Sequence, residues 1–78
     1  MANMTYRVTA DIKYLDGPLV GLLISNGVGV TYPTLTSAHR FVDALRRCER
    51  EQDFFRACVT GNRYAIVGNI AVTETVTS

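Results

Sequence analysis

The sequence predicts a small α+β domain in which an antiparallel β-sheet carries one amphipathic helix on one face. Three observations predict it: strict apolar–polar alternation near the start, a change to helical spacing in the middle, and a return to alternation afterwards. The 78 residues are enough for a single domain, 1–78, with a thin core and no room for a second.

The first strand has the clearest pattern. Between residues 6 and 14 every second side chain is apolar, and the intervening ones are polar. A period of two with one apolar face is typical of a half-buried antiparallel strand. Asp16-Gly17-Pro18 then predicts a break, because glycine permits positive φ and proline cannot donate to a ladder.

Two further strands are expected before the helix. Residues 19–25 are apolar on both faces, which favours a central strand. Asn26-Gly27 predicts a tight hairpin turn, because a type I′ turn needs positive φ at both central positions. Residues 28–32 alternate again as a third strand, so the three strands would form a meander that ends at Pro33.

Helical spacing begins after Pro33 and predicts a helix over residues 36–50, with Thr36 or Ser37 as its cap. Residues 55–60 and 63–67 alternate as two more strands, giving the order β-β-β-α-β-β. Gly68-Asn69 is either a further turn, in which case residues 70–76 form a sixth strand, or a bulge inside one long strand.

Composition narrows the class of protein. The chain is 47% hydrophobic with a net charge of +1, which is typical of a folded protein without a global field towards nucleic acid or anionic membrane. The longest aliphatic stretch is far shorter than the roughly twenty residues that a membrane helix needs. No signal peptide is recognisable, so we expect a cytoplasmic protein, in the host cell if a phage encodes it.

The sequence offers no catalytic, cofactor-binding or metal-binding set, and we expect a protein that is not an enzyme. The single histidine, His39, stands four residues before Asp43, which fits a solvated helix-surface pair better than a catalytic one. Cys48 continues the apolar stripe of the helix and should be buried, whereas Cys58 should be exposed, with its reactivity left open.

Two surfaces are candidates for binding a partner. One helix cannot cover both faces of a five-stranded sheet, and the doubly apolar segment 19–24 favours cover by a partner or a second copy. The candidate side chains are the helix arginines and the polar face of the first strand, namely Arg40, Arg46, Arg47, Arg50, Arg7, Asp11 and Lys13. Nucleic acid is a less favoured partner, because the aromatic residues follow the core pattern instead of the basic face.

In size, soluble character, lack of a catalytic residue set and strand–helix–strand layout, the chain resembles the small α+β inhibitors that phages and mobile elements make against host defences, anti-CRISPR proteins among them. The resemblance implies a stoichiometric inhibitor of a host protein or ribonucleoprotein complex. Many such inhibitors are strongly acidic, and this chain is near neutral. The alternatives are a nucleic-acid-binding accessory protein that uses the helix arginines, and a homo-oligomerising structural module such as a homodimer.

Overall fold

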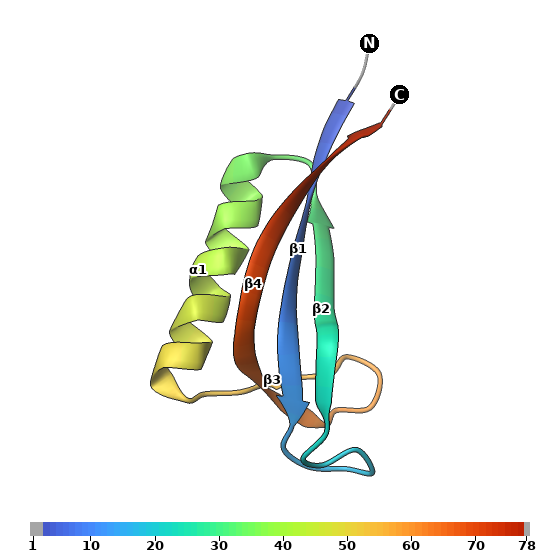
Figure 1. Cartoon of the computed structure of the whole chain (residues 1–78), viewed down its shortest axis with the longest axis vertical. Coiled ribbons are helices and arrows are strands. Elements are labelled where there is room, and N and C mark those ends of the chain that lie inside the picture. Colours follow the sequence, from blue (N-terminus) through green and yellow to red (C-terminus); the bar gives the residue numbers. More distant parts are fainter. Residues whose placement is uncertain (1–2, 78) are drawn as a thin grey trace.

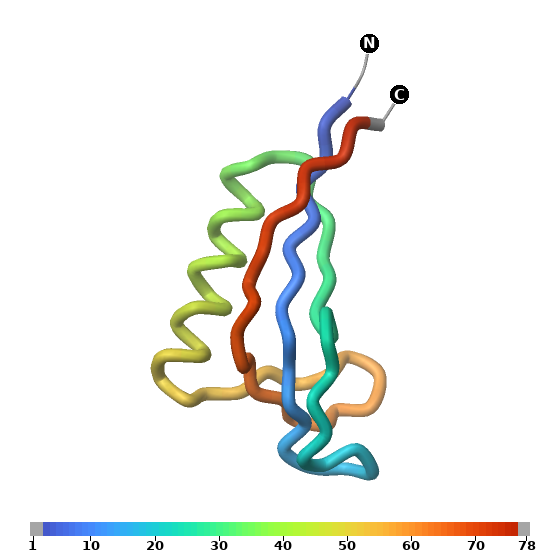
Figure 2. The backbone as a smooth tube through the Cα atoms, in the orientation of Figure 1, coloured from blue at the N-terminus to red at the C-terminus, as the bar shows by residue number. Residues whose placement is uncertain are grey.

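The computed structural model describes residues 3–77 and confirms the fold class, one helix on an antiparallel sheet. The strands are β1 (Asn3–Tyr14), β2 (Leu23–Tyr32), β3 (Phe55–Arg56) and β4 (Arg63–Thr77), and the helix is α1 (Leu35–Glu51). The sheet order is β2-β1-β4-β3, so β1 lies between β2 and β4 (Figures 1 and 2). Four strands are present among the described residues, one fewer than predicted.

The core lies between α1 and the sheet face that the alternation of β1 predicts. Val8, Ala10 and Ile12 of β1 are almost completely buried, and so is Leu45 of α1.

The helix extends one residue further at each end than predicted. It is capped by Thr34, whose hydroxyl accepts from the Ser37 N–H at 3.2 Å, and not by Thr36 or Ser37. Among the described residues no helix is long and apolar enough to cross a membrane.

The predicted three-strand meander is wrong. Residues 19–22 belong to the connection between β1 and β2, and β2 is a single strand that continues through Asn26-Gly27. Asn26 does have positive φ, 53°, as the turn prediction required. A bulge uses this conformation as readily as a type I′ turn does, and here it is a bulge.

Asp11 marks the position where both neighbours of β1 bulge. Between Ala10 and Ile12 of β1 there is one residue, whereas three residues of β2, 25–27, lie between their partners Val28 and Ile24. The register with β4 changes at Asp11 as well, around Gly68 and Asn69. Of the two alternatives for Gly68-Asn69, a turn or a bulge, the structure therefore has the bulge. Residues 70–76 are part of β4 and not a sixth strand.

The strand predicted over residues 55–60 is reduced to the two residues of β3, and residues 57–62 form a loop. Backbone hydrogen bonds within this loop, such as Gly61 N–H to the Ala57 carbonyl at 2.8 Å, close it into a turn before β4. Beyond Tyr64 the outer edge of β4 therefore has no strand beside it in the described chain.

The two glycines of β2 that face β1 should respond differently to alanine. A Cβ at Gly27 would collide with the buried side chain of Ile12, which cannot move away, whereas one at Gly29 would meet the flexible end of Arg7. We expect Gly27→Ala to lower the free energy of unfolding by about 1–3 kcal/mol, and Gly29→Ala to change it by less than about 0.5 kcal/mol. Urea unfolding of the two variants measures this, and equal losses would contradict the packing at Gly27.

Candidate functional site

The connection between β1 and β2 exposes the largest group of aliphatic side chains that are close in sequence. We call it the aliphatic tip, and it consists of Leu15, Leu19, Val20, Leu22 and Leu23. Val20 and Leu23 are 62% and 66% exposed, against 0% for Val8 in the core. Single exposed aliphatic residues are ordinary on a protein surface, but a contiguous group of them is typical of a binding surface.

Hydrogen bonds hold the backbone of the aliphatic tip. Gly21 N–H donates to the Tyr14 carbonyl at 2.8 Å, and Leu22 N–H donates to the Leu19 carbonyl at 3.0 Å. Gly17 and Gly21 both have φ near +80°, a region in which glycine is strongly favoured. A tip ordered in this way loses less conformational entropy on binding than a mobile loop would.

An ion pair ties the tip to the start of β4. The Asp16 carboxylate accepts from the Arg63 N–H at 2.9 Å and from Arg63 Nε at 2.8 Å, and Leu15 N–H donates back to the Arg63 carbonyl. These hydrogen bonds from Arg63 lower the pKa of the Asp16 carboxyl below its usual 3.8. The Arg63 guanidinium also lies over the Phe54 ring, 5.3 Å from its centroid. These contacts connect the aliphatic tip to the start of β4 and to Phe54.

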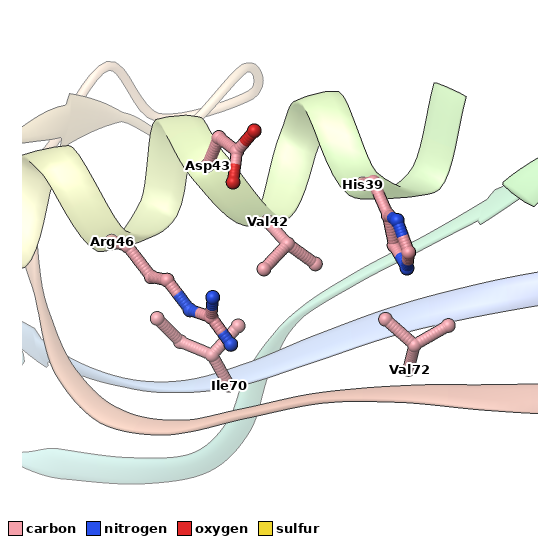
Figure 3. A pocket seen from close by; sticks show the side chains of 6 residues that line it. All are labelled: His39, Val42, Asp43, Arg46, Ile70 and Val72. Atoms are coloured by element: carbon pink, nitrogen blue, oxygen red, sulfur yellow. The ribbon is translucent and has the colours of Figure 1, made fainter. Parts of the chain in front are cut away.

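A second candidate surface is a groove of about 360 Å³ between α1 and β4. Its lining comes from His39, Val42, Asp43 and Arg46 of the helix and from Ile70 and Val72 of the strand. Figure 3 shows His39 and Arg46 reaching from the helix towards β4. The groove therefore combines the Arg46 guanidinium and the Asp43 carboxylate with apolar lining from Val42, Ile70 and Val72.

The helix arginines are exposed but scattered. Arg46 lines the groove, whereas Arg40 and Arg47 lie with Asp43 on the outer surface of the helix. Within residues 3–77 the only ion pair is Asp16–Arg63, and His39 and Asp43 share no hydrogen bond. Four helix arginines, Arg50 included, are available to a partner without first breaking an internal ion pair.

The sheet face opposite α1, which we call the open face, is mostly polar, and the exposed Leu23 opposite Lys13 is an apolar exception. Its central row is Thr5, Arg7, Thr9, Asp11 and Lys13 of β1, and the residues paired with Arg7 are Thr31 and Thr73. The premise of the predicted cover, a strand over residues 19–25 that is apolar on both faces, is therefore wrong. Residues 19–22 belong instead to the aliphatic tip, because the chain turns at residues 15–22 before β2 begins. Leu23, the first residue of β2, belongs to both the tip and the open face.

The predicted binding residues of the open face differ in their availability. Asp11 accepts from the Asn26 N–H at 2.9 Å and from Asn69 Nδ2 at 2.6 Å, so its carboxylate serves the two bulges. Arg7 donates to the Thr31 hydroxyl at 3.2 Å. Lys13 is exposed. Tyr6, Tyr14, Tyr32 and Tyr64 all pack on the helix side, which leaves this face without the stacking rings that single-stranded nucleic acid uses.

The cysteines lie where the sequence predicts. Cys48 is buried in the core, and burial raises the pKa of its thiol, whereas Cys58 is exposed in the loop before β4. Residues 3–77 contain no group of three potential metal ligands from His, Cys, Asp and Glu.

The aliphatic tip is the surface that the sequence-based prediction did not place. The apolar run 19–24 was visible, but strand and loop are hard to tell apart in a short apolar segment. The residue that could have indicated a connection is Gly21, because glycine readily adopts positive φ. In the structure Gly21 has a φ of +82°. The groove beside Arg46 could not be predicted, because it depends on how α1 lies against β4.

No protein-family model, curated protein or solved structure matches this chain.

Acid should destabilise the fold partly through Asp11 and Asp16. The hydrogen bonds from Asn69 and Asn26 lower the pKa of the Asp11 carboxyl, and those from Arg63 lower the pKa of Asp16. A carboxyl whose pKa is lower in the folded state stabilises the fold above the unfolded pKa, and this contribution is lost as the pH falls through the folded pKa. We therefore expect the melting temperature to fall between about pH 5 and about pH 2, and to fall less in Asp11→Asn and Asp16→Asn.

The matched control is Asp43→Asn, which removes an exposed aspartate that accepts no hydrogen bond within residues 3–77. Thermal melts followed by circular dichroism across this pH range make the comparison. Parallel pH profiles for the wild type and all three variants would contradict the assigned roles of Asp11 and Asp16.

Proposed function

We propose that this chain is a non-enzymatic protein-binding module whose principal contact is the aliphatic tip. The observation that carries the proposal is the exposure of five aliphatic side chains on a hydrogen-bonded connection that the Asp16–Arg63 ion pair holds to β4. Burying exposed aliphatic surface favours association by about 25 cal/mol per Å² before the costs of binding are subtracted.

The resemblance to phage-encoded inhibitors narrows the partner class to host defence complexes. In that form the chain is a stoichiometric, anti-CRISPR-type inhibitor that occupies a site on a host defence complex. The size and layout of the chain support this form. The aliphatic tip offers an apolar contact surface, and the helix arginines, which form no ion pair within residues 3–77, offer charged contacts to a protein or ribonucleoprotein. The host cytoplasm is the compartment that this proposal requires.

The tip is tested with variants that place charge on exposed positions, so that folding is not the limiting factor. The double variant Leu19→Asp/Leu22→Asp should lose at least about tenfold in affinity for a protein that co-purifies with the wild type in equal molar amount. Arg46→Glu/Arg47→Glu is the matched control on the helix, and Val67→Asp is a matched aliphatic control on β4. Loss of binding in the helix variant with retention in the tip variant would overturn the tip as the principal contact.

The inhibitor form has its own test. In bacteria with active CRISPR–Cas immunity, expression of the chain should raise the plating efficiency of a targeted phage, and Leu19→Asp/Leu22→Asp should remove this effect. A bound host protein without any change in plating would leave a binding module and refute the anti-CRISPR form. Capture of generic DNA or RNA, with an affinity that falls steeply as salt is added, would instead support a nucleic-acid-binding protein.

A further inference from the structure

The outer edge of β2 has no neighbouring strand within residues 3–77, because β2 is the first strand in the order β2-β1-β4-β3. Its second half, residues 28–32, pairs in continuous register with residues 6–10 of β1. This half contains no charged residue and no proline. Natural proteins protect exposed edges with charges, prolines or bulges, and the bulge of β2 affects only residues 25–27.

The helix leaves the core face open beside this edge. Val30, Val8 and Val72 form one row across the sheet, since Val8 pairs with both of the others. Val8 is fully buried, whereas Val30 is 37% exposed. The cause is the position of α1, which packs mainly against β4 and, of the three long strands, least against β2 (Figure 1). An uncharged edge therefore adjoins an apolar side chain that the protein's own helix does not cover.

We propose that a second copy of this chain occupies this edge, with the two β2 strands antiparallel about a twofold axis at Val30. The two Val30 side chains then face each other, and Val28 of each copy lies across from Tyr32 of the other. Antiparallel pairing keeps both helices on the same face of one continuous sheet. Each α1 packs mainly over β4, away from the β2 edge at which the two copies meet, so the helices do not collide.

A second copy fits this edge because the strand is complementary to itself. An isologous interface brings each residue against its own symmetry mate or against a nearby position, so a charged strand would repel itself. Residues 28–32 avoid this repulsion. A charge close to this half of β2 is the Arg7 guanidinium on the open face, which lies over Gly29 and donates to Thr31. Two such guanidinium groups approach each other across the axis, so association should strengthen as salt screens them.

This proposal does not depend on the proposed function, because the tip and residues 28–32 are different parts of the surface. In the dimer the two aliphatic tips lie at opposite ends and both stay accessible. The tip variant Leu19→Asp/Leu22→Asp should therefore dimerise as the wild type does. The dimerisation of this variant therefore distinguishes a failure of the dimer proposal from a failure of the proposed function.

Sedimentation equilibrium tests the dimer directly. The wild type should approach twice the 8.6 kDa chain mass at high concentration and fall towards 8.6 kDa on dilution. Val30→Lys and Val30→Glu should each weaken dimerisation at least about tenfold, and an equimolar mixture of the two should restore it, since the axis places position 30 against itself. Val67→Lys, a matched change of an exposed valine two strands away, should not alter the mass.

A wild type that stays monomeric at millimolar concentration would overturn the proposal. So would folded Val30 variants that still dimerise singly, or whose mixture stays monomeric. If the Val30 variants do not fold, amide hydrogen exchange of the wild type decides. Outward-pointing amides of residues 28–32 should be more protected in concentrated than in dilute protein, and equal protection would refute the edge contact.

Discussion

The carboxylate of Asp11 is the interaction on which the geometry of the sheet depends. It lies on the central strand and accepts hydrogen bonds from Asn26 of one neighbouring strand and Asn69 of the other, both with φ of 53°. Each neighbour gains two residues relative to β1 across this point, as the pairings on either side show. Since side chains alternate with a period of two, an even insertion returns each strand to the same face, and a single inserted residue would have reversed it.

This even insertion explains which sequence-based predictions succeeded. The alternation in β1 is unbroken because the extra residues are in its neighbours, so its buried face could be read directly. The helix was equally readable, with Ala38, Val42, Leu45 and Cys48 buried on one stripe. Both patterns are local and periodic. Asn26-Gly27 was misread because positive φ is a local property that turns and bulges share, and only the pairing with Asp11 separates them.

The candidate surfaces show the same division. Exposure of the helix arginines follows from their position on the helix, and the sequence predicted it. The conformation of the apolar segment after Pro18 could not be predicted from the sequence. Nothing local determines whether such a segment pairs as a strand or turns back as a connection. The deciding contacts are distant in sequence, from Asp16 to Arg63 and from Gly17 to Asn62. The open face is polar for a related reason: its residues come from the polar half of β1 and from a Thr-rich β4.

The placement of β1 between β2 and β4 also bears on how the chain folds. The β1–β2 hairpin and the helix consist of neighbours in sequence and can form early, but β1 pairs with β4 from Asn3 with Thr77 to Tyr14 with Tyr64. Contacts of such long sequence separation require loop closure before they stabilise anything, which slows folding. During synthesis the unpaired edge of β1 and one flank of the nascent core therefore remain exposed to solvent until β4 has left the ribosome.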